Sequence, residues 1–280
     1  MEDYGILYVC ATPIGNLEDI TLRVLRVLKE ADIIAAEDTR HTLKLLTHYN
    51  IKNKLVSYHK HNEGRMSAEL LKTLLEGKKA ALVTDAGLPS VSDPGASLIR
   101  ACRDAGVAVS VLPGANAALT ALVSSGMYAA EFTFMGFLPE KTDKKAHADF
   151  LERLSENKGT LILYAAPHHL VKTLKILYNA LGERKICTAR ELTKKYEEVL
   201  FFSLSAAADF YEKNEPKGEF VLIIEKAENA EISDDWESLT IKEHVNYYIK
   251  LGYEKKDALK LTAKERRLPK SDVYKEFLNE

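Results

Sequence analysis

The chain has 280 residues, 46% of them hydrophobic and 29% charged, a balance typical of a globular protein with one large or two medium domains. Its formal net charge of −2 excludes binding of nucleic acid through bulk charge, so such binding would need a local basic patch. The three cysteines lie far apart and form no CxxC pair, which argues against a zinc ribbon or a disulfide framework and fits a reducing compartment.

The chain begins with an acidic segment, Met1 to Tyr4, that leads directly into an apolar run and therefore does not resemble a signal peptide. No apolar run approaches the roughly 20 residues that a helix needs to span a bilayer. We therefore expect a cytoplasmic protein that does not bind a membrane.

Apolar strands and amphipathic helices alternate through the first 125 residues. Strands are expected at 5–10, 31–36, 56–59, 80–83 and 107–112, and helices at 17–29, 41–49, 66–75, 97–104 and 117–125. This alternation predicts a mostly parallel sheet flanked by helices. The last helix consists of small residues, and we expect it to bridge to a second domain.

The most informative stretch is the loop 84–95, with the sequence TDAGLPSVSDPG. It follows an apolar strand and precedes a helix, which places it where ligands bind in open α/β sheets. Pro89 and Pro94 fix φ, whereas Gly87 and Gly95 allow backbone angles that a Cβ would block. An ordinary turn between a strand and a helix has about two to six residues, so this longer loop favours a ligand-binding role.

A polar cluster follows the strand 31–36. Glu37, Asp38 and His41 are candidates for a catalytic base. The alternative is a structural cluster in which Asp38 pairs with Arg40 or caps the following helix. The two interpretations have equal weight at this point.

The second half of the chain is less regular, which predicts a mixed sheet. Strands are expected at 132–137, 160–165, 185–189, 198–203 and 219–225, with one helix ending at 154 and another at 169–181. The adjacent residues His168 and His169 cannot share one helical face as metal ligands at positions i and i+4 would, and no metal site is expected.

Residues 225–237 are acidic and indicate a solvated linker. Thr240 and Glu243 then form a capping-box pattern that opens a helix, and further helices are expected at 255–266 and 272–278. This mildly basic segment resembles a helix-turn-helix module, although a packing or dimerisation tail is equally compatible. The expected domains are therefore 1–115, 116–227 and 238–280.

Three common nucleotide and hydrolase motifs are absent from the sequence. There is no GxGxxG after the first strand, no GxxxxGK[ST], and no GxSxG elbow. These absences exclude the Rossmann dinucleotide fingerprint, the P-loop and the α/β-hydrolase nucleophile.

Several motifs in a single order resemble the tetrapyrrole methylase superfamily and, within it, the ribosomal RNA small subunit methyltransferase I family. They are ATPIGNLEDIT at 11–21, EDTR at 37–40, DAGLPSVSDPG at 85–95, PGANA at 113–117, GFLP at 136–139, RELTK at 190–194 and GEF at 218–220. The resemblance extends from about Leu7 to Glu225, and the tail also looks like that of the family.

The resemblance implies a two-domain α/β fold with a parallel N-terminal sheet, a mixed C-terminal sheet and a small helical tail. It implies a homodimer that binds S-adenosylmethionine between its domains and methylates the 2′-oxygen of a cytidine in the decoding region of 16S rRNA. The cofactor-binding role then falls on Asp85, Ala86, Gly87, Pro89, Ser90, Val91, Asn116, Ala117, Tyr164, Ala165, Ala166, Ala189, Gly218, Glu219 and Phe220.

This reaction also implies roles for polar residues that are not expected to bind the cofactor. The 2′-hydroxyl is weakly acidic, so a base among Glu37, Asp38 and His41 would assist its attack. Contacts to RNA phosphates or bases, which position the substrate, are expected from Arg40, Lys44, His59, Lys60 and Arg190.

Two other functions are compatible with parts of the sequence. Members that modify tetrapyrroles have a GxGPGD-type first loop, whereas this chain has ATPIGNLED, which favours the RNA branch over a precorrin-like substrate. A non-catalytic ribosome-binding protein on the same scaffold is the third possibility. The intact cofactor loop argues against it.

Overall fold

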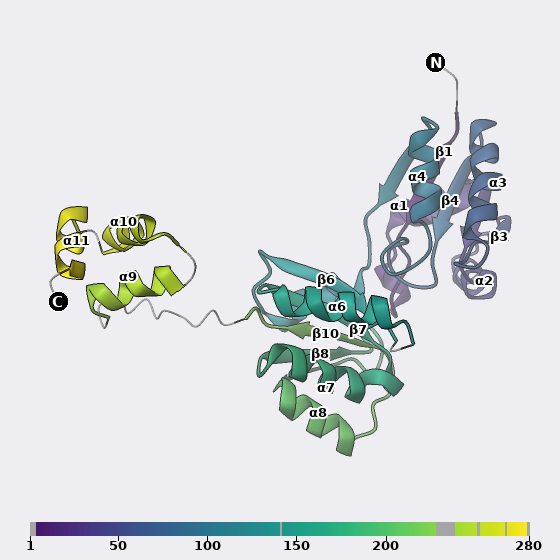
Figure 1. The fold of residues 1–280 in the computed structure, drawn as a ribbon. Helices are drawn as coiled ribbons and strands as arrows, with labels where there is room; N and C mark the ends of the chain where they lie inside the picture. The colour runs from purple at the N-terminus through teal and green to yellow at the C-terminus, as the bar shows by residue number, and fades with distance from the viewer. Residues whose placement is uncertain (1–3, 141, 228–238, 251–252, 267, 279–280) are drawn as a thin grey trace. The chain divides into compact units, whose positions relative to one another are not determined.

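The computed structural model describes residues 4–140, 142–227, 239–250, 253–266 and 268–278. The chain divides into two compact units, residues 1–227 and residues 228–280 (Figure 1). Among the described residues, no helix is both long enough and apolar enough to cross a membrane.

The first sheet has five strands in the order β3-β2-β4-β1-β5, and every neighbouring pair is parallel. Its strands are β1 Ile6–Cys10, β2 Ile33–Ala36, β3 Leu55–Ser57, β4 Lys79–Val83 and β5 Ala108–Leu112. The predicted parallel sheet is thus confirmed. Helices cover both faces of this sheet, and accordingly the central strands β2 and β4 are apolar and buried apart from the exposed Lys79 at the start of β4.

Two helices pack on each face of this sheet. Helices α1 (Leu22–Glu30) and α2 (Thr39–His48) contribute to one core cluster, and α3 (Glu63–Leu75) and α4 (Ala96–Asp104) contribute to the other. A short 3-10 turn, Leu17–Asp19, precedes α1. The predicted helix at 17–29 is therefore two elements, because Thr21 caps a new helix by accepting the Val24 N–H at 3.1 Å.

All five strands end at the same edge of the sheet. The connection after β2 leads outward to β3, whereas the connection after β4 leads to β5 at the opposite side. Connections that diverge from neighbouring strands open a crevice at their carboxyl ends. The loop 84–95 and the residues after β2 both lie at this crevice.

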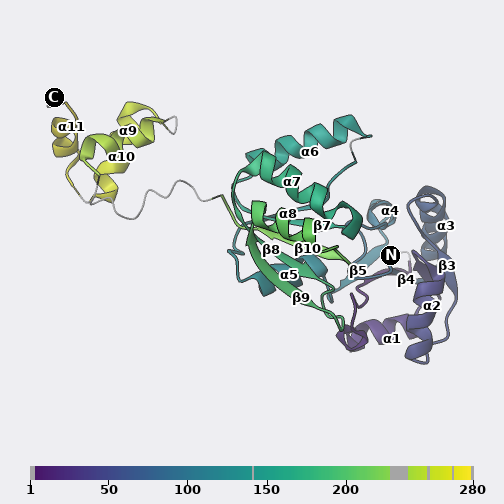
Figure 2. The same ribbon diagram turned by 90° about the horizontal axis from the view of Figure 1, so that it is seen from below.

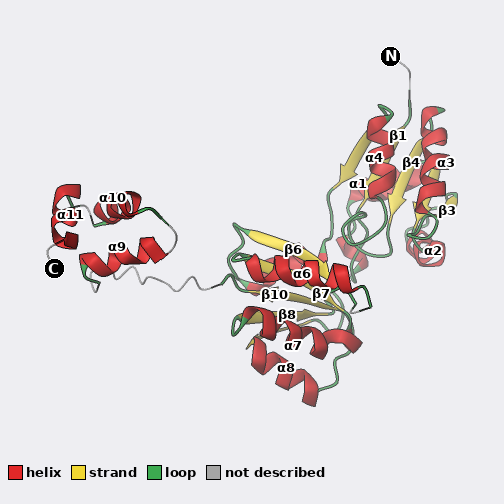
Figure 3. Ribbon diagram, viewed as in Figure 1, coloured by secondary structure: helices red, strands yellow, loops and turns green. Residues whose placement is uncertain are grey.

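The second sheet has the order β6-β7-β10-β8-β9, and only the pair β6–β7 is parallel (Figure 3). Its strands are β6 Phe132–Phe137, β7 Thr160–Ala165, β8 Lys185–Arg190, β9 Glu198–Ser203 and β10 Phe220–Ile224. The predicted mixed sheet is confirmed. One face is covered by α6 (Lys144–Glu156), α7 (Leu170–Leu181), which follows a 3-10 turn at Pro167–His169, and α8 (Leu204–Lys213).

Helix α5 (Ala117–Ser125) covers the other face of the second sheet (Figure 2). It follows the last strand of the first sheet, yet its buried residues Ala118, Ala121 and Leu122 pack against β7, β8 and β10. Helix α5 therefore connects the two sheets along the chain, and the division into domains at residues 115 and 116 stays a prediction.

Helix α8 was absent from the expected elements. It begins directly after β9, where the side chain of Ser203 accepts the Ala206 N–H at 3.4 Å. Its buried residues Leu204, Ala207, Ala208 and Tyr211 have a helical spacing, so the sequence does contain the signal.

The second unit contains α9 (Ile241–Lys250), α10 (Lys255–Glu265) and α11 (Lys270–Leu278) around a small apolar core. The capping box is confirmed, because the Thr240 N–H donates to the Glu243 carboxylate at 2.8 Å and the Glu243 N–H donates to Thr240 Oγ1 at 3.2 Å. Of the predicted linker 225–237, residues 228–237 lie outside the described residues. The helix-turn-helix interpretation of this unit stays a prediction.

Candidate functional site

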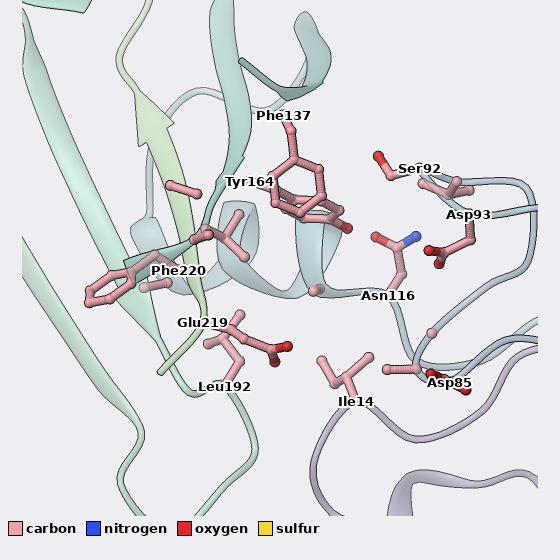
Figure 4. Close-up of a pocket in the computed structure, with 18 of the residues that line it drawn as sticks. Ile14, Asp85, Ser92, Asp93, Asn116, Phe137, Tyr164, Leu192, Glu219 and Phe220 are labelled. Atoms are coloured by element: carbon pink, nitrogen blue, oxygen red, sulfur yellow. The ribbon is translucent and has the colours of Figure 1, made fainter. Parts of the chain in front are cut away.

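A cavity of about 470 Å³ lies between the carboxyl edge of the first sheet and the strand ends of the second (Figure 4). Its volume is within the range of about 300–1,000 Å³ that is common for small-molecule sites. We call it the first cavity. Figure 4 shows Asp85 and Asp93 on the side of the first sheet and Leu192, Glu219 and Phe220 opposite them.

The loops around the first cavity are tied together by their backbones. Thr12 and Gly87 exchange two hydrogen bonds, at 2.9 and 3.0 Å, and Thr12 Oγ1 donates to the Thr84 carbonyl at 3.1 Å. Gly87 has a φ of +77°, in the left-handed region that favours glycine. The first loop of the chain is therefore joined to the loop 84–95.

The loop 84–95 has an unusual backbone. Ser90 and Ser92 have φ values of 72° and 68°, in a region that non-glycine residues rarely adopt. The Ser90 N–H donates to the Pro94 carbonyl at 3.2 Å, and the Gly95 N–H donates to the Glu63 carboxylate at 3.0 Å. Such conformations persist where their surroundings hold them, and they concentrate at ligand-binding sites.

Most of the residues expected to bind the cofactor line the first cavity. These are Asp85, Ala86, Gly87, Val91, Asn116, Ala117, Tyr164, Ala165, Ala166, Ala189, Glu219 and Phe220. Pro89, Ser90 and Gly218 are not among the residues that line it. Gly218 packs closely against Glu191, which lines the cavity: a Cβ added to Gly218 would lie 2.5 Å from Glu191 Cγ.

Several residues that line the first cavity were not predicted from the sequence to bind the cofactor. Ile14, Asp93, Phe137, Leu192 and Lys194 also line the first cavity. Each belongs to a motif that supports the family resemblance, and this membership was the available signal.

Three carboxylates, Glu37, Asp85 and Asp93, gather at the first-sheet side of the first cavity. Burial raises the pKa of Asp93 to about 6, the charges of Glu37 and Asp85 add to this rise, and Lys60 opposes it. Burial and the nearby Asp85 charge also raise the pKa of Glu37. Because ionised carboxylates are costly here, the site favours a ligand with a positive charge.

The opposite side of the first cavity provides an aromatic and apolar surface. The rings of Phe137 and Tyr164 lie edge to face, with centroids 5.4 Å apart. Burial raises the pKa of the Tyr164 hydroxyl, and the backbone of Ala118 opposes the rise. Together with Leu192, these rings offer contacts to a planar ligand group.

The three candidate bases do not converge on one point. Glu37 lines the first cavity. Asp38 caps α2 by accepting the Arg40 N–H at 2.8 Å, and it pairs with the Arg40 guanidinium at 2.7 Å, which holds the pKa of its carboxyl well below the usual range. His41 lines a separate cavity of about 550 Å³, which we call the second cavity.

The residues expected to contact RNA are also distributed. Lys44 lines the second cavity, and Arg40 and Lys44 share the exposed face of α2. The charges of Lys60 and His59 oppose the rise in the Glu37 pKa. Arg190 lies 3.4 Å from the Glu198 carboxylate on the neighbouring strand.

The segment after β8 is held by hydrogen bonds to the residue before β10 and to the first loop. Lys194 Nζ donates to Glu191 at 3.0 Å and to Glu219 at 2.9 Å, and these bonds raise the Lys194 pKa although burial opposes the rise. Beside it, the Asn16 N–H from the first loop donates to Thr193 Oγ1 at 3.0 Å. The first loop therefore contacts the segment after β8.

A family model and two curated relatives match most of the chain. The family model for Tetrapyrrole (Corrin/Porphyrin) Methylases matches residues 6–208. The proteins named ribosomal RNA small subunit methyltransferase I from Halalkalibacterium halodurans and Bacillus subtilis are 49% and 47% identical to the chain over 277 residues, covering 98% of it and 94% of each relative.

Solved structures share the fold at lower identity. The uroporphyrin-III C-methyltransferase from Thermus thermophilus, solved with S-adenosylhomocysteine, aligns with a TM-score of 0.55 and 20% identity over 79% of this chain and 97% of that one. A diphthine synthase aligns with a TM-score of 0.60 and 14% identity over 80% of this chain and 90% of that one.

Proposed function

The chain belongs to the ribosomal RNA small subunit methyltransferase I family of the tetrapyrrole methylases, and on that basis we propose that it methylates the 2′-oxygen of a cytidine in the decoding region of 16S rRNA. The methyl donor is S-adenosylmethionine, and the enzyme acts in the cytoplasm as a homodimer. The observation that supports this most is the identity of 49% over almost the whole of both chains.

The first cavity fits S-adenosylmethionine in charge and in shape. When bound, this cofactor supplies an electrophilic methyl group on a positively charged sulfur. Glu37, Asp85 and Asp93 provide negative charge for that sulfonium, whereas Tyr164 and Leu192 provide apolar contacts for the adenosine. The raised pKa of Asp93 agrees with this assignment, because a bound cation would relieve the cost of ionising it.

The protein contributes mainly by positioning. The hydrogen bonds that join Thr12 to Gly87 and Asn16 to Thr193 hold the walls of the site in fixed relation. Holding two reactants in line contributes on the order of 7–11 kcal/mol for well-oriented pairs. Proton removal from the 2′-hydroxyl falls to Glu37 or His41, because Asp38 already serves as a helix cap and an ion-pair partner.

Transfer of labelled methyl groups tests this function directly. The protein, labelled S-adenosylmethionine and small ribosomal subunits or free 16S rRNA are incubated, and ribose methylation is mapped by its resistance to alkaline cleavage. We expect label at one cytidine of the decoding region. Transfer to a precorrin-like tetrapyrrole, with none to 16S rRNA, would contradict the proposal.

Binding of S-adenosylmethionine should weaken below pH 6. Asp93 has a pKa of about 6 in the free protein, and a bound cation favours its ionised form. Protons and cofactor therefore compete, so the Kd should rise as the pH falls from 7 to 5. The cofactor keeps its own charges in this range, because α-carboxyl and α-amino groups titrate near about 3.5 and 8. Calorimetric titration measures the effect, and Asp93→Asn should flatten it.

Exposed apolar side chains support the homodimer. Leu119 and Val123 on α5 are 48% and 79% exposed, and Phe201 on β9 is 59% exposed. Exposed apolar surface of this kind marks interaction sites. We expect Val123→Glu with Phe201→Glu to give a monomer in light scattering. Tyr178→Glu on α7, on the opposite face of the second sheet, is the control and should leave a dimer. A wild-type protein that is already a monomer would refute the proposal.

A further inference from the structure

The second cavity lies against α2 and is distinct from the first cavity, which we assign to the cofactor. Its volume is about 550 Å³, and the first loop, helix α2 and the residues after β4 line it. We propose that this second cavity receives the target nucleoside of a single-stranded RNA segment, with the nucleoside turned out of its strand. This assignment rests on the proposed RNA methyltransferase function.

The two cavities share a wall. Ile14, Asp85, Ala86, Lys194 and Glu219 line both of them. Methyl transfer requires the accepting oxygen and the donated carbon to approach within about 3–3.5 Å in line. A substrate compartment must therefore open onto the cofactor compartment, and the second cavity meets this requirement.

Charge decides which ligand occupies which cavity. The first cavity has Glu37, Asp85 and Asp93 on one side, and these carboxylates repel a phosphodiester chain. The second cavity is lined by His41, Lys44 and Lys194 and by two carboxylates, Asp85 and Glu219. The first cavity shares Lys194 and these two carboxylates and adds Glu37, Asp93 and Glu191, so it is the more acidic of the two. The balance of charge therefore favours RNA in the second cavity.

The wall of the second cavity contains a polar atom without a partner. Thr84 is 2% exposed, and within the described part of the chain its Oγ1 has no hydrogen-bond partner. Its backbone carbonyl, in contrast, accepts from Thr12 Oγ1 at 3.1 Å. Buried hydroxyls nearly always have a partner, and Thr84 Oγ1 is closed to water, so a ligand atom reaches it only if this wall shifts when the second cavity is filled.

The exposed face of α2 leads from the surface to the second cavity. Arg40, Leu43, Lys44, Thr47 and His48 line a shallow hollow there, and Lys44 lines the hollow and the second cavity alike. Arg40 is 88% exposed, and its bidentate pair with Asp38 engages Nε and Nη2, so its Nη1 donors can still contact a phosphate. Leu43, which is 55% exposed, offers an apolar contact for a flanking base.

Two variants and a matched control test the assignment. Lys44→Glu reverses a charge at the mouth of the second cavity, Thr84→Val removes the unpartnered hydroxyl at nearly constant volume, and Lys29→Glu makes the same charge change on the exposed surface of α1. Each is assayed for the KM of RNA, for kcat and for the Kd of S-adenosylmethionine, and its thermal midpoint reports folding.

We expect Lys44→Glu to raise the KM of RNA about tenfold and to lower the salt dependence of binding by about one unit of slope. Thr84→Val should lower kcat/KM for RNA by roughly two- to tenfold, the range of one hydrogen bond. Both should keep the wild-type Kd for S-adenosylmethionine, and Lys29→Glu should match the wild type throughout.

The results that would contradict the assignment of the second cavity differ from the result that would contradict the proposed function. If the wild type methylates RNA but Lys44→Glu keeps the wild-type KM, the assignment of the second cavity is wrong. It is also wrong if both variants weaken S-adenosylmethionine, because the second cavity would then hold part of the cofactor. If the wild type transfers no methyl group to RNA, the proposed function itself fails.

Discussion

Replacing Asp85 by alanine should weaken the binding of S-adenosylmethionine by roughly 10- to 100-fold. The Asp85 carboxylate lines both cavities, and its Oδ1 accepts the Asp38 N–H at 3.1 Å. Hydrogen bonds to charged groups contribute about 1.5–3 kcal/mol, and about 1.4 kcal/mol corresponds to a factor of ten in affinity. Calorimetric titration with the cofactor measures the change, and methyl transfer should fall with it.

Asp85→Asn separates the two roles of this carboxylate. The asparagine oxygen can still accept the Asp38 N–H, so the thermal midpoint should stay near that of the wild type, whereas the negative charge that we propose for binding the sulfonium is lost. We therefore expect weaker cofactor binding in both variants and reduced stability chiefly in Asp85→Ala. Wild-type cofactor affinity in both variants would remove Asp85 from the cofactor site.

Replacing Gly15 by alanine should lower methyl transfer by roughly 100-fold, because it separates the two loops that close the site. A Cβ on Gly15 would lie 2.5 Å from Lys194 Cγ, 2.7 Å from Thr193 Oγ1 and 2.9 Å from the Leu192 carbonyl oxygen. The backbone oxygen cannot rotate away, so one loop must move. A displacement of about 1 Å can reduce an enzymatic rate by about 10².

Gly64→Ala is the matched control for this substitution. Gly64 lies in α3, and a Cβ there would meet nothing within 4 Å. We expect unchanged methyl transfer and a stability gain of at most about 0.5–1 kcal/mol from the better helix former. Full activity in Gly15→Ala would show that the contact between the first loop and the segment after β8 does not position the reactants.

The fold was predictable from local patterns. Continuous apolar runs such as 80–83 indicated strands covered on both faces, and the alternation with helices indicated parallel pairing, which the structure confirms. Helix α8 was missed although its buried residues have a helical spacing, because it follows β9 without a separating loop. Its start depends on Ser203, which is both the last residue of the strand and the cap of the helix.

The cofactor loop was predictable for a different reason. Its length, its prolines and its glycines all lie within twelve consecutive residues, so local sequence contains the whole signal. The structure adds Leu88, Ser92 and Asp93 to the residues that line the first cavity and leaves out Pro89 and Ser90. Which side chains of a loop face a cavity depends on its backbone angles, and the left-handed Ser90 and Ser92 are not evident from sequence.

Strand period, turn chemistry and motifs are local properties, so the kind of each sheet, the family and the loop that borders the site could be predicted from the amino-acid sequence. What the neighbouring residues Glu37, Asp38 and His41 face could not be predicted, because it depends on how the chain packs. They stand where a strand passes into a helix, and side chains there diverge, so one lines the first cavity, one caps the helix and one lines the second. Contact between Asn16 and Thr193, 177 residues apart, likewise exists only because the two sheets pack together.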